Sequence, residues 1–545
     1  MKSYIEPLLR NALAQISAPD DTEIILERPK QADHGDLSTS VALGLARHLK
    51  KAPRLIAEEL VAALAVDKSD VSGVEIAGPG FINFRFTPAF FQGRLNAVQQ
   101  KAEEYGRTNN EDGIKTNVEY VSANPTGPLH PGHGRNAALG DTIANILNWV
   151  GHDVTREYYF NNAGNQMRNL AKSIHARYLE LLGHDVEFPE DGYRGEYIYE
   201  IARDVIENEG EKYVEVTDEN IDAMRGFGEQ WNFALIKKTM EALGIHHDTF
   251  FNETTLYEEG KIEQTITRLA EVGRTYNKDG ALYLKLEDLG RDDRVIVKSS
   301  GEPTYRLPDI AYHMEKLERG FEKIIDVLGA DHIDAVPDVT AAVGMLGGEA
   351  SNIVPVIHQM VSFVEGGEQV KFSKRSGKAI TLDELIEDFG ADVVRFFFIM
   401  RGANTHLEFD LDLAREQSDK NPVFYLQYAH ARISGVLRHA ESEGIALNMG
   451  ASLEPLQADE EITLIKQILE FPEALERAAR DLEPQIIAEY LRELAVAFHK
   501  FYHEHRIVGA NTDAERDARL RLLAASKTTF ANGLMVLGVD VPERM

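Results

Sequence analysis

The spacing of apolar positions changes along the chain, and in the central part it predicts an α/β region. Short apolar runs bounded by turn residues, typical of strands, occur at 116–121, 153–159, 281–286, 294–298, 323–328 and 353–358. Segments with apolar residues three and four apart, typical of helices, include 164–183, 195–208, 219–244, 261–272 and 336–347. Strands that alternate with helices indicate a Rossmann-type parallel sheet with helices on both faces.

The region before this sheet has a mixed pattern. Helical spacing covers 5–16 and the segment after Pro53, and strand patterns occur at 23–27 and on both sides of the Gly-Pro-Gly bend at 78–80. We therefore predict a small N-terminal α+β domain over residues 1–110.

From Thr381 onward the pattern is almost wholly helical. Thr381 and Glu384 have the spacing of a capping box, in which two side chains cap each other's backbone N–H groups. The helical segments beyond it are 390–402, 411–441, 457–480, 484–507 and 512–537. This pattern predicts a separate all-α bundle over 381–545, with the parallel-sheet domain over 111–380.

Composition narrows the class of protein. The 545 residues include 58 Lys and Arg, 89 Asp and Glu and no cysteine, and the formal net charge is −31. Without cysteine there are no disulfides and no cysteine-ligated zinc, which fits a cytoplasmic location. No apolar run is long enough to span a membrane, and the first residues have no signal-peptide pattern. The acidity argues weakly against a nucleic-acid partner, although a local basic surface would suffice for one.

The stretch from Ser122 to Arg135 carries the strongest candidate chemistry. We expect a strand before it, a Gly- and Pro-rich turn within it, and a helix from Asn136. A helix start offers free N–H groups and the positive end of the helix dipole, which suit a phosphate. Gly132 lets a ligand approach the backbone closely, and His130 and His133 add imidazole donors. On its own, His-Pro-Gly-His is equally compatible with an ordinary solvated turn.

A second element lies far downstream, at Lys371-Phe372-Ser373-Lys374-Arg375-Ser376-Gly377. Together with His130-Pro131-Gly132-His133, it resembles the HxGH and KMSKS signatures of class I aminoacyl-tRNA synthetases. The sequence from Ser122 to Arg135 is similar to that of arginyl-tRNA synthetases of the bacterial type. Pro131 stands where a small aliphatic residue is usual and Phe372 where Met is usual, and neither change removes a polar group.

The resemblance extends over nearly the whole chain. Residues 34–36 and 77–83 are similar to the N-terminal domain of arginyl-tRNA synthetases, which contacts the tRNA elbow, and 390–396 and 421–432 are similar to their anticodon-binding bundle. The resemblance implies an arginine–tRNA ligase, which converts L-arginine and ATP to arginyl-adenylate and transfers arginine to the 3′ end of tRNA(Arg), giving AMP and pyrophosphate. It also implies Mg²⁺ with ATP, no zinc, and adenylate formation that waits for bound tRNA. We expect a monomer.

Adenylate formation needs positioned donors and cations more than a general base, because negative charge builds on the phosphates of ATP. By resemblance, the catalytic residues are His130, His133, Lys371 and Lys374. The residues that the resemblance assigns to ATP binding are Gly132, Ser373, Asp331 and His332, together with both histidines and Lys374. Taken alone, the lysines are more typical of a solvated charge run.

Arginine as the amino acid requires carboxylates that can hold a planar guanidinium by paired hydrogen bonds. By resemblance, the arginine-binding residues are Glu119, Asn124, Tyr305, Asp309 and Gln166. Tyr305 and Asp309 would frame the guanidinium, and Asn162 stands where this family commonly has Asp. From the residues alone, Glu119 could be a surface acid at a strand end and Asp309 the N-cap of a helix.

Unstacked tRNA bases bind to aromatic and basic side chains. The candidates in the C-terminal bundle are Tyr425, Tyr428, His430 and Arg432. Phe498 and Tyr502 have a spacing that core packing explains better. Three other hypotheses stay open: a class I synthetase for another amino acid, a nucleotidylyltransferase, and a synthetase-like RNA-binding protein without catalysis.

Overall fold

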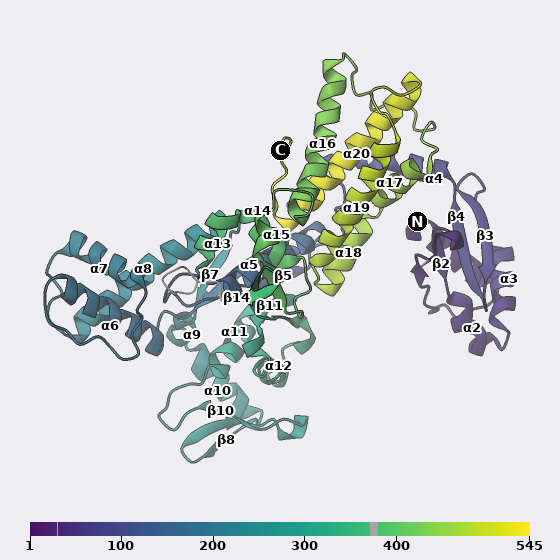
Figure 1. Cartoon of the computed structure of the whole chain (residues 1–545). Coiled ribbons are helices and arrows are strands. Elements are labelled where there is room, and N and C mark those ends of the chain that lie inside the picture. Colours follow the sequence, from purple (N-terminus) through teal and green to yellow (C-terminus); the bar gives the residue numbers. More distant parts are fainter. Residues whose placement is uncertain (30, 371–379) are drawn as a thin grey trace.

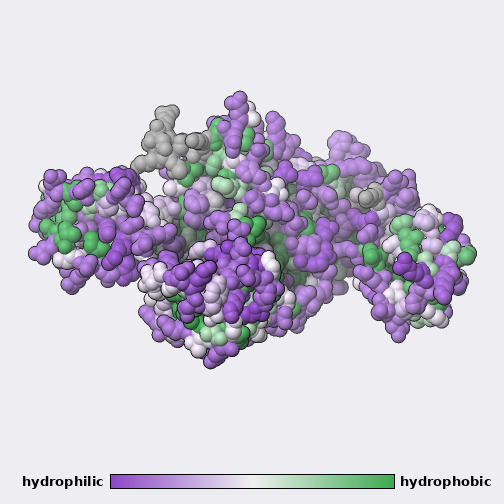
Figure 2. Space-filling model, turned by 90° about the horizontal axis from the view of Figure 1, so that it is seen from below, coloured by the Kyte–Doolittle hydropathy of each residue, from purple (hydrophilic) through white to green (hydrophobic). Residues whose placement is uncertain are grey.

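The computed structural model describes residues 1–29, 31–370 and 380–545 of the chain. Its parts spread out from a central parallel sheet (Figure 1). The N-terminal domain lies at one end and a helical insertion at the other, with a small antiparallel sheet below and the C-terminal helices above. The face in Figure 2 is largely hydrophilic, as the strongly negative charge leads one to expect, and its apolar side chains form small patches.

The predicted parallel sheet is confirmed, with the strand order β12-β11-β5-β6-β7. Its strands are β5 (Lys115–Glu119), β6 (Asp153–Phe160), β7 (Thr249–Asn252), β11 (Lys323–Gly329) and β12 (Ile353–His358). Val118 of β5 and Ile325 of β11 are completely buried, because helices cover the central strands. All carboxyl ends lie along one edge, where ligands of such sheets bind.

Two of the predicted strands do not belong to this sheet. They are β9 (Ala281–Leu284) and β10 (Arg294–Val297), which form a separate antiparallel sheet with β8 (Thr275–Lys278). The fifth parallel strand, β7, was not predicted, since four residues carry too little periodicity. Apolar alternation indicates that a segment is a strand but does not identify its partner.

Helices connect the strands of the two sheets. They are α5 (Pro131–Trp149), α9 (Thr254–Glu258), α10 (Lys261–Glu271), α11 (Arg306–Glu318) and α12 (Val336–Met345). The insertion between β6 and β7 consists of α6 (Gly164–Leu181), α7 (Glu196–Glu209) and α8 (Asp218–Ala242). These three helices share a core of their own, which includes Ile174, Ile198 and Met224.

The N-terminal domain pairs an antiparallel sheet with helices. The helices are α1 (Lys2–Gln15), α2 (Val41–Leu49), α3 (Pro53–Ala63) and α4 (Pro88–Lys101). The sheet has the order β1-β2-β4-β3, with β1 (Leu26–Glu27), β2 (Leu37–Thr39), β3 (Val71–Ala77) and β4 (Phe81–Phe86). Gly35, just before β2, has φ +94°, and a Cβ there would lie 2.6 Å from the carbonyl oxygen of Phe84. Only glycine fits this bend without displacing β4.

The C-terminal region is helical apart from one short strand. The predicted capping box of Thr381 and Glu384 begins α13 (Leu382–Phe389). The helices that follow are α14 (Ala391–Ile399), α15 (Leu411–Arg415), α16 (Pro422–Ser442), α17 (Asp459–Leu469), α18 (Phe471–Asp481), α19 (Gln485–Glu504) and α20 (Asp513–Leu537). In the part of the chain that the structure describes, none of the helices combines the length and apolar character of a bilayer span.

A small sheet connects the central domain to this region. β13 (Val361–Glu365) and β14 (Glu368–Val370) form a hairpin, and β15 (Leu407–Asp410) pairs in parallel with β13. β15 therefore contacts a strand that precedes the predicted boundary at 380. The boundaries at 110 and 380 stay predictions.

Candidate active site

The helix that carries the two histidines starts earlier than predicted. α5 begins at Pro131 with His130 as its N-cap, so Gly132 and His133 lie in its first turn. A proline is well suited to this position, because its missing N–H is one that a helix start leaves unpaired. Gly134 allows α5 to pack closely on α13, since a Cβ there would lie 2.6 Å from Leu382 Cδ1.

His130 and His133 cap each other. The backbone N–H of His133 donates to Nδ1 of His130 at 3.3 Å, and that of His130 donates to Nδ1 of His133 at 3.3 Å. The rings are stacked with centroids 3.6 Å apart. Because both Nδ1 atoms accept, each neutral ring carries its proton on Nε2. The pair thus offers two Nε2–H donors beside the free N–H groups of the helix start.

Both imidazoles are neutral at neutral pH. Burial lowers the pKa of His133 to about 3, with further lowering from nearby His130 and His358. Burial also lowers the pKa of His130. The two rings therefore act as hydrogen-bond donors rather than as cations.

The ends of neighbouring strands supply further polar groups. His358, the last residue of β12, accepts at Nε2 from the Asn136 amide at 3.2 Å, and Asn136 also binds the carbonyl of Val327 at 2.7 Å. Asp331 and His332 follow β11 on an exposed 3₁₀ turn, and Asp331 lies near enough to raise the pKa of His358 against the lowering by burial. The sequence prediction missed His358 and Asn136, although His358 ends a predicted strand.

The predicted lysine element lies outside the described residues. Lys371, Ser373 and Lys374 follow β14 directly in the chain, and their roles stay predictions.

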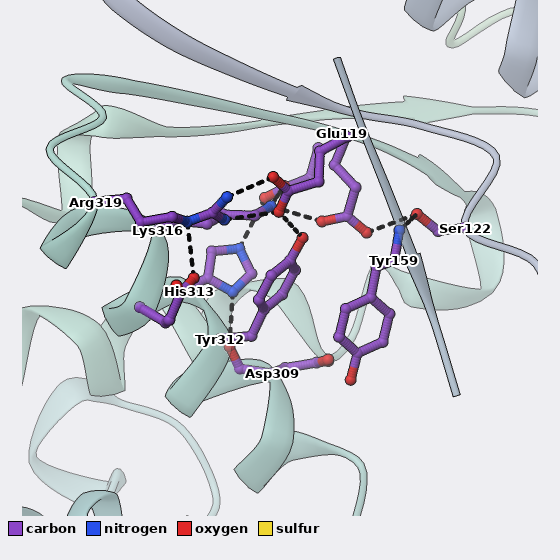
Figure 3. A network of polar contacts seen from close by, with 11 residues as sticks. Glu119, Ser122, Tyr159, Asp309, Tyr312, His313, Lys316 and Arg319 are labelled. Atoms are coloured by element: carbon purple, nitrogen blue, oxygen red, sulfur yellow. Dashed lines mark hydrogen bonds and ion pairs between the residues drawn. The ribbon is translucent and has the colours of Figure 1, made fainter. Parts of the chain in front are cut away.

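Glu119, the last residue of β5, is buried rather than at the surface, with 8% of its area exposed. Its Oε2 accepts from Nζ of Lys316 at 2.6 Å and its Oε1 from the hydroxyl of Ser122 at 2.8 Å (Figure 3). The alternative interpretation of Glu119 as a surface acid is therefore wrong.

Asp309 lies within the first turn of α11, which has Tyr305 at its N-cap position, so Asp309 is not the cap. Among the described residues, no hydrogen-bond donor binds the Asp309 carboxylate. Burial raises the pKa of Asp309 to about 7, with Glu119 and Glu253 raising it further and His313 opposing them. Tyr305 is 61% exposed, and the Arg306 guanidinium lies 4.8 Å from the centre of its ring.

Glu253 is a second acid beside Asp309, and sequence reasoning missed it. It follows β7 and accepts from the hydroxyl of Tyr159 at 2.6 Å and from the amide of Asn161 at 2.8 Å. Burial raises the pKa of Glu253. No sequence motif pointed to Glu253, because it directly follows β7, a strand that the sequence pattern did not predict.

Asn124 and Gln166, predicted to bind arginine, do meet. The Asn124 amide donates to Oε1 of Gln166 at 2.8 Å, and Oδ1 of Asn124 accepts from the backbone N–H of Asn161 at 3.0 Å. Asn162 points into the insertion, where its amide donates to Glu229 at 2.9 Å and its Oδ1 accepts from Thr254 at 2.8 Å.

The predicted tRNA-contacting residues on α16 face different ways. Tyr428 is 41% exposed, and the Arg432 guanidinium lies 4.7 Å from its ring centre, while Tyr425 packs on His499 at 5.1 Å. His430 is 2% exposed, and its Nδ1 lies 2.9 Å from the carbonyl oxygen of Pro542. This contact holds the C-terminal segment, so His430 is not part of the exposed surface. Phe498 is completely buried, as predicted.

A parallel sheet with paired histidines at the helix start after β5, followed by a helical bundle, is the arrangement of class I aminoacyl-tRNA synthetases. Three family models match the chain: "Arginyl tRNA synthetase N terminal domain" over residues 3–86, "tRNA synthetases class I (R), catalytic domain" over 95–394, and "DALR anticodon binding domain" over 426–545. The chain belongs to the arginyl-tRNA synthetase family.

Individual relatives agree over the full length. The arginine–tRNA ligase of Salinibacter ruber is 47% identical, with 100% of each chain covered. That of Bacillus subtilis is 43% identical over 100% of this chain and 99% of the relative. The solved arginyl-tRNA synthetase of Thermus thermophilus has the same fold, with a TM-score of 0.79, 23% identity and 100% of both chains covered.

Proposed function

We propose how the described residues carry out arginine–tRNA ligation, the activity that this chain has as a member of its family. In the first step, a carboxylate oxygen of arginine attacks the α-phosphorus of ATP. The new P–O bond gives arginyl-adenylate, and pyrophosphate leaves with the electron pair of the broken bond. In the second step, a hydroxyl of the terminal tRNA ribose attacks the carbonyl carbon, and AMP leaves.

The triphosphate would bind at the start of α5. The Nε2–H groups of His130 and His133 donate to phosphate oxygens, beside the backbone N–H groups around Gly132. Asp331 and His332 would contact the nucleoside. Lys371 and Lys374, with Ser373, would neutralise the charge that develops on pyrophosphate.

Mg²⁺ would enter with ATP, held mainly by phosphate oxygens and water. The residues that the structure describes include no group of three His, Asp or Glu side chains that could hold a metal ion.

The guanidinium of arginine would bind between Asp309 and Glu253, under the ring of Tyr305. Asp309 has no donor among the described residues and Glu253 has only neutral ones, so a planar cation with several N–H groups would complete the site. Asn124 and Gln166 would hold the α-amino end. Glu119 would accept a hydrogen bond from the α-amino group. Each of its carboxylate oxygens has a lone pair that the bonds to Lys316 and Ser122 do not use.

The tRNA would contact the exposed side of α16 through Tyr425, Tyr428 and Arg432, while the domain over residues 1–110 reaches another part of the molecule. His430 is left out of this set because it is buried. We also propose a monomer located in the cytoplasm, with domains over 1–110, 111–380 and 381–545.

One observation carries the proposal: the mutually capped histidines and the unpaired acid Asp309 both lie at the carboxyl-end edge of one parallel sheet. Charging of total tRNA with labelled arginine tests it. We expect charging with arginine and no other amino acid, and a rate that falls strongly in Lys374→Ala while folding is retained. Binding of tRNA without charging would favour a non-catalytic RNA-binding protein. Vigorous ATP–pyrophosphate exchange in the absence of tRNA would contradict the tRNA dependence that the family implies.

A further inference from the structure

A group of charged side chains lies next to the proposed arginine pocket, and the proposed function gives its cations no role (Figure 3). Its centre is Lys316 on α11, which is completely buried. Its Nζ donates to Oε2 of Glu119 at 2.6 Å and to Oδ1 of Asp326 on β11 at 2.8 Å. Burial alone would lower the pKa of Lys316, but the two carboxylates raise it above its usual value, so the ammonium keeps its charge.

His313 supplies a second cation on the same helix. Its Nδ1 lies 2.7 Å from the backbone carbonyl oxygen of Asp309, and its Nε2 lies 2.9 Å from Oδ2 of Asp326. Both partners accept hydrogen bonds, so both ring nitrogens donate and the ring is an imidazolium. Burial alone would lower the pKa of His313, and the neighbouring Asp326 carboxylate outweighs it.

The acids behind the pocket are therefore matched by cations. Glu119 and Asp326 face the two positive charges of Lys316 and His313. A third buried acid, Glu157, accepts from both terminal nitrogens of the Arg319 guanidinium, each at 2.7 Å.

Two acids on the pocket side of this group have no ion-pair partner among the described residues. They are Asp309 and Glu253, and the donors to Glu253 are the neutral groups of Tyr159 and Asn161. A carboxylate without an ion-pair partner attracts a cationic ligand more strongly than one that is already paired.

We propose that Lys316 is a specificity-determining positioning residue, which occupies the acid pair Glu119 and Asp326 and so leaves Asp309 and Glu253 as the one place where the guanidinium of arginine binds. The inference rests on the proposed arginine pocket. Without the Lys316 ammonium, two neighbouring pairs of acids would compete for the substrate cation. Negative charge would also accumulate around Asp309 and favour its protonated form, which does not bind a guanidinium.

The readout is the pH dependence of the KM for arginine. Asp309 faces titratable groups from every element around it: His313 on α11, Glu119 on β5, Glu253 before α9, Asp326 on β11 and Tyr159 on β6. In Lys316→Met, two acids lose their cation, so we expect the pH midpoint for arginine binding to rise by about one unit. At pH 7 this corresponds to a rise of about fivefold in the KM for arginine. The KM for ATP should change less than about twofold, because ATP would bind at the start of α5.

Lys316→Gln separates the charge of Lys316 from its hydrogen bonds. The glutamine amide keeps two N–H donors for Glu119 and Asp326 but has no charge, so the midpoint should rise as in Lys316→Met. Lys316→Arg keeps the cation and should leave the midpoint close to that of the wild type. Arg319→Met is the matched control. Arg319 directly follows α11, and its loss removes the cation that pairs with Glu157 on β6, so the midpoint should stay unchanged.

Wild-type protein that does not charge tRNA with arginine would refute the proposed function. Given wild-type charging, the inference is refuted if Lys316→Met changes the KM values for arginine and ATP equally, or if Lys316→Gln leaves the midpoint at its wild-type value. Should Lys316→Met not fold, Lys316→Gln still decides, because it keeps donors for both carboxylates and a purely structural lysine predicts no shift of the midpoint in that variant.

Discussion

The guanidinium of Arg395 and the carboxylate of Asp141 form a buried ion pair, with Nη2 2.6 Å from Oδ2, that joins α14 to α5. Arg395 is 1% exposed and also donates to the carbonyl oxygens of Leu243 at 2.8 Å and Leu537 at 3.2 Å. These carbonyls lie at the ends of α8 and α20. One side chain therefore links the helical insertion and the C-terminal bundle to the helix that carries the two histidines.

Arg395→Met should lower the free energy of unfolding by about 3 kcal/mol, because it leaves a buried carboxylate and two carbonyls without their donor. Asp141 keeps Arg156, at 3.5 Å, as an ion-pair partner, and the Tyr120 hydroxyl and the Asn145 amide donate to it at 3.5 and 3.4 Å. Urea denaturation measures the loss. Lys420→Met, which removes an exposed ion pair of 3.9 Å, is the control and should change stability by less than about 0.5 kcal/mol. Equal losses of unfolding free energy in the two variants would show that the buried ion pair stabilises the fold no more than the exposed one.

His133 should make the protein less stable in acid. Burial lowers its pKa to about 3 in the folded state, against about 6.5 in an unfolded chain. Between these values the unfolded state binds a proton that the folded state does not, so stability falls as the pH falls from about 6.5 towards 3. We expect His133→Asn to flatten this part of the curve of unfolding free energy against pH. A curve as steep as that of the wild type would assign the acid sensitivity to other groups.

Features that depend on residues close together in the chain could be predicted from the sequence. The capping box of Thr381 and Glu384 spans one helical turn, and the structure contains it. The start of α5 was placed too late, because Gly132 and Gly134 were interpreted as turn residues. In the structure, the missing side chain of Gly134 serves helix packing against Leu382 instead.

Contacts between distant segments could not be predicted. Lys316 binds Glu119, which is 197 residues away in the chain, and the sequence around neither residue predicts this contact. Glu253 was missed for the same reason, and β9 and β10 were assigned to the wrong sheet. Burial, too, depends on the whole fold: Tyr428 and His430 looked equivalent in the sequence, yet only Tyr428 is exposed.

Arginine binding should weaken below pH 7. Burial raises the pKa of Asp309 to about 7, and the carboxylate must be ionised to bind a guanidinium. The KM for arginine should therefore rise about fivefold from pH 7 to pH 6 and about tenfold for each pH unit below that. Asp309→Asn should raise the KM by a factor on the order of 100 and remove this pH dependence. Aminoacylation at pH 5.5 to 8 with saturating ATP and tRNA measures both, and a variant that keeps the wild-type pH profile would exclude Asp309 as the titrating group.

Asn162 should not tolerate the aspartate that is common at this position in the family. Its Nδ2 donates to Glu229 at 2.9 Å, and an aspartate would place a second carboxylate there. We expect Asn162→Asp to cost about 1–3 kcal/mol of stability, since the hydrogen bond becomes a repulsion. Asn162→Asp/Glu229→Gln restores a donor and should recover most of the loss. If the double variant is no more stable than the single one, the Glu229 contact does not explain the asparagine.

Substitutions of Tyr428 and His430 should have different effects, the first on tRNA binding and the second on stability. Stacking of a base on an aromatic side chain contributes about 1–3 kcal/mol, so Tyr428→Ala should raise the KM for tRNA at least about fivefold and leave the KM for arginine unchanged. His430→Ala removes a buried hydrogen bond to the Pro542 carbonyl and should lower stability by about 1–2 kcal/mol, with little effect on the KM for tRNA at temperatures where the protein is folded. Charging kinetics and thermal denaturation of both variants give the comparison. A larger effect of His430→Ala than of Tyr428→Ala on the KM for tRNA would place the contact on the opposite side of α16.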